Sequence, residues 1–287
     1  MKVMKFGGTS VGSPERMKEV VNLILKDKKE VFVVLSAMSG TTNTLIEIAD
    51  YLYKKNHEGA NEIINRLEQK YISYIDELYS TNEYKEKVYN FFQKEFNYLR
   101  SFTNDIFTSF EEKSIVARGE ILSTNMVVNY LLENGIKAKL INALDFMRTD
   151  KNSEPDAVYI KEKLSAIMAS NNDYQVYITQ GFICKNAYGE VDNLQRGGSD
   201  YTASLVGAAI NAEEIQIWTD IDGMHNNDPR IVENTEAVRQ LNFEEASELA
   251  YFGAKILHPT CVQPAKYAGI PVRLKNTMEP EADGTII

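Results

Sequence analysis

Short apolar runs alternate with amphipathic segments along most of the chain, and this alternation is the main structural signal in the sequence. Continuous apolar runs of about five residues predict strands buried on both faces, whereas an apolar period of 3.6 residues predicts helices. Strands are expected at Val3–Phe6, Val31–Leu35, Lys137–Ile141, Gln175–Gln180, Ile215–Thr219 and Val272–Lys275. Their alternation with helical segments predicts an α/β fold around a mainly parallel sheet.

Several helices are marked by local start signals. Ser13 is expected to be the N-cap of a helix with Pro14 in its first turn, and Ser153-Glu154-Pro155 is expected to start another helix. Further helices are expected at Ser199–Ile210, near Glu244–Phe252 and near Val262–Tyr267. A hairpin is expected from Phe182–Cys184 and Glu190–Leu194, with its turn at Tyr188-Gly189.

The segment from Asn43 to about Tyr130 differs from the rest of the chain. It consists of long amphipathic stretches without proline, and eight of the sixteen tyrosines fall between Tyr51 and Tyr98. These tyrosines form either a stacking surface for a ligand or an aromatic stripe that packs on the core. The helical period favours the packed stripe.

Composition excludes some classes of partner. The 287 residues include 31 Lys and Arg against 41 Asp and Glu, which gives a net charge of -10. Nucleic acids and anionic membranes favour basic surfaces, so neither is expected as a partner, although a small anionic ligand remains compatible. No apolar stretch is long enough for a membrane span, and the first residues do not resemble a signal peptide.

The scarce cysteines and histidines also limit the chemistry. Cys184 and Cys261 are expected to be inert buried thiols, as in a protein of the reducing cytoplasm. Three histidines cannot assemble a zinc-like cluster, and His225 and His258 lack the nearby Ser or Cys pattern of a catalytic base. We therefore expect a cytoplasmic protein without a protein-held metal site.

Polar, glycine-containing loops follow the carboxyl ends of predicted strands, where ligands bind in open α/β sheets. They span Gly7–Gly12, Ser36–Thr42, Gln195–Asp200 and Thr219–Arg230. Two of these regions share one pattern, in which Lys5 or Arg196 precedes two glycines and a hydroxyl residue. Glycine amides can approach phosphate oxygens closely, so both loops are candidate phosphate sites, although each alone could be an ordinary turn.

Other candidate residues have two interpretations each. Asp200 either favours the dipole of its helix or organises cations or Mg²⁺. Glu120 lies where a polar turn meets a helix, and it either serves a site or pairs with Arg118 on the surface. Trp218 is expected in the core rather than as a stacking platform, and Lys255 by itself could be a surface lysine.

Seven motifs, taken together, resemble aspartate kinases. They are Lys-Phe-Gly-Gly-Thr-Ser-Val from Lys5, Val-Leu-Ser-Ala-Met at 34–38, Arg-Gly-Glu at 118–120, Arg-Gly-Gly-Ser-Asp-Tyr at 196–201, Trp-Thr-Asp-Ile-Asp-Gly at 218–223, Asp-Pro-Arg at 228–230 and Phe-Gly-Ala-Lys-Ile-Leu-His-Pro at 252–259. The motifs are co-linear from one end of the chain to the other. The resemblance implies the fold of the amino acid kinase superfamily, a three-layer αβα sandwich around a mainly parallel sheet.

The resemblance also implies roles for individual residues. Catalytic roles fall on Lys5, Asp200 and Lys255, with Lys5 nearest the transferred phosphoryl group and Asp200 holding the cations in register. On the aspartate side it implies Ser36, Thr42, Ser199, Glu120 for the α-ammonium and Arg196 for the α-carboxylate. On the ATP side it implies Lys5, Gly7, Gly8, Thr219, Asp220, Arg230, Lys255 and His225, which replaces the family's usual Tyr and whose imidazole could pack on the nucleotide.

The implied reaction transfers the γ-phosphoryl of ATP to the β-carboxylate of L-aspartate, with Mg²⁺, on the way to lysine, threonine and methionine. Alternatives are another superfamily kinase, such as glutamate 5-kinase or acetylglutamate kinase, and a non-catalytic sensor of amino acids or nucleotides. Glu120 with Arg196 favours an acceptor that has both free α-charges. We expect a catalytic domain at 1–275 and, at 276–287, the start of a linker toward ACT regulatory domains absent from this chain, with a homo-oligomer in the full-length form.

Overall fold

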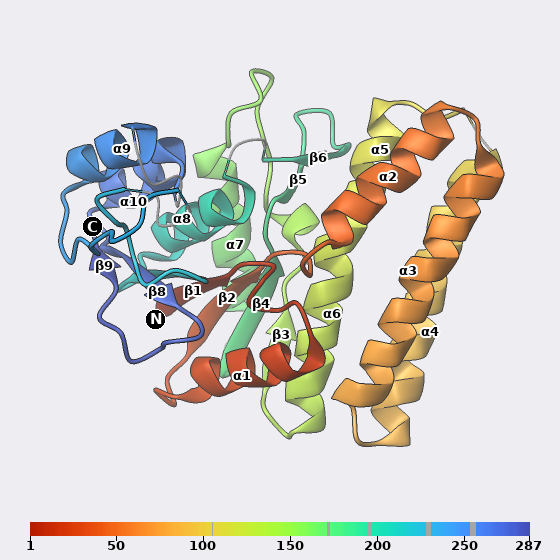
Figure 1. Ribbon diagram of the computed structural model, residues 1–287, viewed down its shortest axis with the longest axis horizontal. Helices are drawn as coiled ribbons and strands as arrows, with labels where there is room; N and C mark the ends of the chain where they lie inside the picture. Colours follow the sequence, from red (N-terminus) through yellow and green to blue (C-terminus); the bar gives the residue numbers. More distant parts are fainter. Residues whose placement is uncertain (105, 171–172, 195–196, 228–230, 253–256) are drawn as a thin grey trace.

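A seven-stranded sheet forms the centre of the molecule (Figure 1). The computed structural model describes residues 1–104, 106–170, 173–194, 197–227, 231–252 and 257–287. The strands are β1 (Lys2–Phe6), β2 (Val31–Leu35), β3 (Ala138–Leu140), β4 (Val176–Gln180), β7 (Ile215–Thr219), β8 (Val272–Asn276) and β9 (Thr285–Ile286). Their spatial order is β3-β4-β2-β1-β7-β8-β9, and every neighbouring pair is parallel except β8 with β9.

The position of β1 decides where a ligand can bind. The chain leaves β1 for β2 on one side, and β7 later pairs with β1 on its other side. In the register, Phe6 lies opposite Leu35 and Trp218, so the carboxyl ends of the three strands are level. This reversal of strand order opens a crevice beyond those ends, which is the usual place for a ligand in an open α/β sheet.

Helices cover both faces of the sheet, and the predicted three-layer αβα arrangement is confirmed (Figure 1). One apolar cluster joins the sheet to α1 (Pro14–Leu25), α2 (Thr41–Tyr53), α3 (His57–Leu78), α4 (Asn82–Ser101), α5 (Ser109–Val116) and α6 (Arg118–Glu133). The other joins it to α7 (Ala157–Ala169), α8 (Gly198–Ile210), α9 (Phe243–Phe252) and α10 (Gln263–Ala268). All five residues of β2 are buried, as its uninterrupted apolar run predicts.

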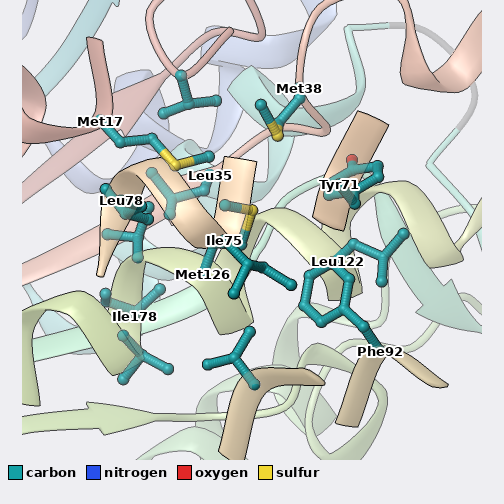
Figure 2. Packing of buried hydrophobic residues seen from close by; sticks show 14 of the residues in the cluster. Met17, Leu35, Met38, Tyr71, Ile75, Leu78, Phe92, Leu122, Met126 and Ile178 are labelled. Atoms are coloured by element: carbon teal, nitrogen blue, oxygen red, sulfur yellow. The ribbon is translucent and has the colours of Figure 1, made fainter. Parts of the chain in front are cut away.

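Most of the tyrosines between Tyr51 and Tyr98 belong to the long α3–α4 hairpin, which extends beside the sandwich at the right of Figure 1, whereas Tyr51 and Tyr53 lie on α2. The inward aromatic side chains of the hairpin pack together. The ring centroids of Tyr71 and Phe92 lie 5.3 Å apart, and the Phe92 ring also packs against that of Phe96. Figure 2 shows Tyr71 and Phe92 in one cluster with Met38 and Leu122. The stripe therefore packs on the core, as its helical period predicts.

The local start signals had mixed outcomes. Ser13 is the N-cap of α1, with its side chain accepting from the amide of Arg16, as predicted. The prediction of a helix start at Ser153 was wrong, because α7 begins at Ala157 with Asp156 as its cap and Ser153 takes a left-handed backbone angle. The predicted hairpin is present as β5 (Ile183–Lys185) and β6 (Val191–Asn193). No helix in the described part of the chain has the length and apolar character to cross a membrane.

Candidate active site

Lys5 and Asp200 form an ion pair at the crevice. Lys5 is on β1, and Asp200 is in the first turn of α8, where an acidic side chain also stabilises the helix dipole. The Lys5 Nζ and Asp200 Oδ1 atoms lie 2.8 Å apart, and both side chains are largely buried. A Cβ atom on Gly7 would lie 3.6 Å from that Nζ, so the ammonium lies close to the predicted phosphate turn.

A second group of predicted residues meets around one pocket. This pocket has a volume of about 350 Å³, and Gly8, Ser36, Thr42, Glu120 and Ser199 line it. The hydroxyl of Ser36, just after β2, donates to that of Ser199 in α8 at 2.9 Å. Three of the four predicted loops therefore contribute to one pocket, and Glu120 of α6 joins them from outside the predicted loops.

Glu120 is the buried acid of this pocket. It lies in the first turn of α6 and is 4% exposed, and its Oε1 accepts a 3.2 Å hydrogen bond from the amide of Ala37. Its other oxygen, Oε2, has no hydrogen-bond partner among the described residues. Burial raises the pKa of Glu120 to about 8, and the amide of Ala37 offsets only part of the rise. The carboxyl group can thus receive a cationic ligand group.

Glu120 does not pair with Arg118, so the surface-pair interpretation was wrong. Arg118 instead binds Glu95 of α4 at 2.9 Å, while Glu120 faces the strand ends. The physical reason is helical geometry. Residues two positions apart lie on different faces of a helix, so the two side chains diverge.

Close packing at the start of α8 requires glycine at two positions. A Cβ atom on Gly197 would lie 1.7 Å from the sulfur of Cys261, and one on Gly181 would lie 2.3 Å from the hydroxyl of Ser199. Cys261 is buried as predicted, and burial raises the pKa of its thiol to about 12. This thiol is therefore part of the packing beneath the ion pair rather than a nucleophile.

The predicted nucleotide-side residues follow β7, next to β1. Thr219 ends β7, and its hydroxyl donates to the Asp220 carboxylate at 3.1 Å. His225 binds within its own loop, through Nε2 to Asp222 at 2.6 Å and through Nδ1 to Thr235 at 2.9 Å. Both ring nitrogens are thus engaged, which leaves the ring faces for any contact with a nucleotide. Trp218 is buried, as expected of a core residue.

Three predicted residues, Arg196, Arg230 and Lys255, lie outside the described part of the chain. The structure also adds residues that sequence patterns did not single out. Phe182 and Asn43 line the pocket, and Phe182 has a left-handed backbone, which only a few per cent of residues other than glycine adopt. Its amide donates to the Thr202 hydroxyl at 3.0 Å. Nothing in the local sequence indicates a left-handed phenylalanine, so no sequence signal could have found it.

A second pocket, of about 490 Å³, lies between the end of α1 and the face of β1 and β7. Several of its charged groups are already paired: Lys2 binds Asp27 at 2.9 Å, the terminal ammonium of Met1 binds Glu213 at 2.7 Å, and Lys26 binds Glu281 at 2.6 Å. Exposed pairs of this kind are ordinary surface salt bridges. The crevice that holds Lys5 and Glu120 is therefore the stronger candidate for chemistry.

A sequence profile described as "Amino acid kinase family" matches residues 1–276. The chain belongs to the amino acid kinase family. Within the family it is 38% identical to aspartokinase 1, chloroplastic, of Arabidopsis thaliana, and the match covers 99% of this chain and 51% of that relative. It is 32% identical to the lysine-sensitive aspartokinase 3 of Escherichia coli strain K12, over 99% of this chain and 63% of the relative.

A solved structure agrees with these sequence relatives. The crystal structure of E. coli aspartokinase III in complex with aspartate and ADP (R-state) matches with a TM-score of 0.89 and 32% identity, over all of this chain and 64% of that one. The fold of the amino acid kinase superfamily, which the motifs predict, is thus confirmed. This chain spans about half to two thirds of the length of these relatives.

Proposed function

We propose that this protein is an aspartate kinase, which transfers the γ-phosphoryl group of ATP to the β-carboxylate of L-aspartate and forms 4-phospho-L-aspartate. The observation that carries the proposal is Glu120, which lines the pocket together with Ser36 and Ser199 and whose buried carboxyl group has one oxygen without a hydrogen-bond partner among the described residues. A carboxylate at this place matches the α-ammonium of an amino-acid acceptor. The 32–38% identity to aspartokinases over 99% of the chain supports the same substrate.

The reaction needs little from the protein beyond positioning and positive charge. An oxygen of the β-carboxylate attacks the γ-phosphorus in line, and the bond from this phosphorus to the β–γ bridging oxygen breaks, so ADP leaves with the electron pair. The acceptor carboxylate is already ionised at neutral pH, so no general base is needed. Charge spreads over the equatorial oxygens of the transition state, where preorganised cations stabilise it.

Lys5 is the described cation best placed for this task. The carboxylate of Asp200 holds its ammonium near the Gly7–Gly8 turn, where the phosphates would lie. Lys255 would add a second cation and Arg196 would bind the α-carboxylate, as their motifs imply. Thr219, Asp220, Arg230 and His225 would face the nucleotide. Asp200 is thus a positioning residue for Lys5 rather than a proton acceptor.

Mg²⁺ fits this site as an ion bound mainly through the nucleotide. The described residues contain no group of three or more His, Cys, Asp or Glu that could hold a metal ion. Mg²⁺ usually keeps several waters and binds substrate phosphates with one or two carboxylates. When bound, it would neutralise charge on the β- and γ-phosphates.

We also propose that the catalytic domain expected at 1–275 extends through β9, which pairs with β8 in the central sheet, that the full-length protein is a cytoplasmic homo-oligomer, and that its product leads toward lysine, threonine and methionine. The chain covers 51% of the Arabidopsis relative, and this difference in length is the support for proposing a longer full-length form.

Trapping the product with hydroxylamine tests the proposed activity. The protein is incubated with ATP and Mg²⁺ and with aspartate, glutamate or acetylglutamate in turn, and the hydroxamate formed from an acyl phosphate is measured. Hydroxamate with aspartate alone is the expected result. Product with glutamate or acetylglutamate instead would indicate another kinase of the family, and ligand binding without any product would indicate a sensor.

A further inference from the structure

The tyrosine-rich α3–α4 hairpin reaches the candidate active site through one hydroxyl group. Tyr71 of α3 is fully buried, and its Oη lies 3.0 Å from the Oγ1 of Thr41, which is also fully buried. Most other contacts of the Tyr71 ring are apolar or aromatic, including those to Phe92 and Phe96. The hydroxyl pair thus connects the hairpin to the first residue of α2.

The first turn of α2 forms one wall of the 350 Å³ pocket that Glu120, Ser36 and Ser199 line. Thr41 begins the helix, and the next two residues, Thr42 and Asn43, line the pocket. Gly40 is the N-cap and has a left-handed backbone, so no side chain caps this end of the helix. A helix end without a side-chain cap depends on contacts made elsewhere for its position.

Thr41 also lies beside the start of α6, where Glu120 is. A Cβ atom on Gly119 would lie 2.8 Å from the Cβ of Ala37 and 3.8 Å from the Cγ2 of Thr41, so α6 packs tightly against Ala37 and lies within ordinary contact distance of Thr41. Ala37 in turn donates its amide to Glu120. The charge of Glu120 reaches Tyr71 as well: burial raises the pKa of Tyr71, and Glu120 adds to the rise. A shift of Thr41 would therefore change the distance between Thr42 and Glu120.

We propose that Tyr71 is a positioning residue for the amino-acid acceptor, because its hydroxyl holds the first turn of α2 against Glu120 through Thr41. This inference rests on the proposed function. It assigns the aromatic hairpin a task in the binding of aspartate, and none in the binding of ATP. Tyr71 touches neither substrate and acts only through Thr41.

A pair of matched variants tests the role of this hydroxyl. Tyr71→Phe removes the bond to Thr41 and keeps the ring, while Tyr79→Phe removes an equally buried hydroxyl that donates to the carbonyl of Met126 at 2.6 Å. In the hydroxamate assay, Tyr71→Phe is expected to raise KM for aspartate by about 2- to 10-fold, the range for one lost neutral hydrogen bond. KM for ATP should stay within about twofold, and Tyr79→Phe should change neither KM.

Variants of Thr41 provide an independent check. Thr41→Val is expected to reproduce the rise in KM for aspartate, and Thr41→Ser, which keeps the hydroxyl, should stay near the unsubstituted protein. The double variant of Tyr71→Phe with Thr41→Val should be no worse than either single one, because both remove the same contact. Thermal unfolding of all variants shows whether a change in KM reflects a loss of folded protein.

The outcomes separate this inference from the proposed function. If the unsubstituted protein forms hydroxamate with aspartate, and Tyr71→Phe changes its KM no more than Tyr79→Phe does, the positioning role is wrong. An equal rise in KM for both substrates would also overturn it, because the effect would then be general. If the unsubstituted protein forms no hydroxamate with aspartate, the proposed function fails, and the inference fails with it.

Discussion

Lys5 and Glu120, the two ionisable side chains at the centre of the site, have different surroundings. Lys5 is held in place by the carboxylate of Asp200, 2.8 Å away. Glu120 forms no ion pair with any described residue, and burial raises its pKa to about 8. A partly buried charge is stable only with a partner, whereas a buried acid without one takes up a proton. This difference is consistent with the roles proposed above, Lys5 toward the transferred phosphoryl group and Glu120 toward the α-ammonium of the acceptor.

Lys5→Ala is expected to lower kcat by about 10²- to 10³-fold with little change in KM for ATP, because in the proposed mechanism the lysine stabilises charge that develops in the transition state. Steady-state kinetics with both substrates varied measures this. Lys2→Ala is the matched control, since Lys2 is on the same strand but pairs with Asp27 at the surface. A higher KM for ATP at unchanged kcat would make Lys5 a ground-state binder.

The raised pKa of Glu120 predicts the pH dependence of aspartate use. Below about pH 8 the carboxyl group of the free protein is protonated and neutral, so it attracts the α-ammonium of aspartate less. We expect kcat/KM for aspartate to fall as pH is lowered from 8 to 6, by up to about tenfold per unit.

Glu120→Gln should abolish this dependence, because an amide does not titrate. At pH 8 it should also lower kcat/KM for aspartate by about 10- to 150-fold, which corresponds to one lost charged hydrogen bond. KM for ATP should barely change. A variant that kept the slope between pH 6 and 8 would assign the titration to another group.

At the scale of elements, the site lies where the carboxyl ends of strands pack closely against the first turns of helices. Gly181 follows β4, and its amide donates to the carbonyl of Leu35 at the end of β2 at 2.8 Å. The first turn of α8 rests on it so closely that an added Cβ atom would lie 2.4 Å from the Cβ of Ser199 and 2.9 Å from its Cα. The Cα is backbone, so a side-chain rotation cannot relieve the overlap.

Gly181→Ala is therefore expected to push α8 away from β2 and separate the hydroxyls of Ser36 and Ser199. KM for aspartate should rise by about 2- to 10-fold, as for the loss of one hydrogen bond, and the protein should also lose stability. Gly135→Asn is the control, because that turn is left-handed and nothing lies within 4 Å of its added Cβ. An unchanged KM in Gly181→Ala would show that α8 tolerates the displacement.

At the scale of the whole molecule, the hairpin and the sheet share one core. A single apolar cluster runs from Trp218 on β7 through α1 and α6 to Phe96 and Leu99 on α4. Figure 1 shows the hairpin standing beside the sandwich, yet its inner face is part of this cluster. A continuous core of this kind favours cooperative unfolding of both parts.

Leu99→Ala is expected to lower the free energy of unfolding by about 2–5 kcal/mol, because Leu99 is fully buried and its truncation leaves a cavity. Trp218 is the only tryptophan and reports on the sheet by fluorescence, while far-UV circular dichroism reports on the helices. Both transitions should shift together in urea. If only the circular dichroism transition moved, the hairpin would unfold as a separate unit.

The sequence by itself determined most of the sheet strands and the edge of the sheet at which the site lies. Buried strands such as β2 are continuous apolar runs, and their turns are glycine-rich, so both can be predicted from local physical chemistry. The carboxyl ends of parallel strands lie at one edge, which brought Lys5, Ser36 and Asp200 together as predicted. The start of α7 was misplaced, because Ser, Asp and Pro can each mark a helix start and only packing selects among them.

Only the tertiary structure decided the pKa of Glu120 and the contacts that hold the residues of the site in position. The pKa of Glu120 depends on its burial beneath Ala37, 83 residues away, and no local pattern encodes that distance. The bond from Tyr71 to Thr41 and the left-handed backbone of Phe182 likewise arise from contacts between separate elements. Burial and proximity are properties of the assembled chain, so the residues that hold the site in place became visible only in the fold.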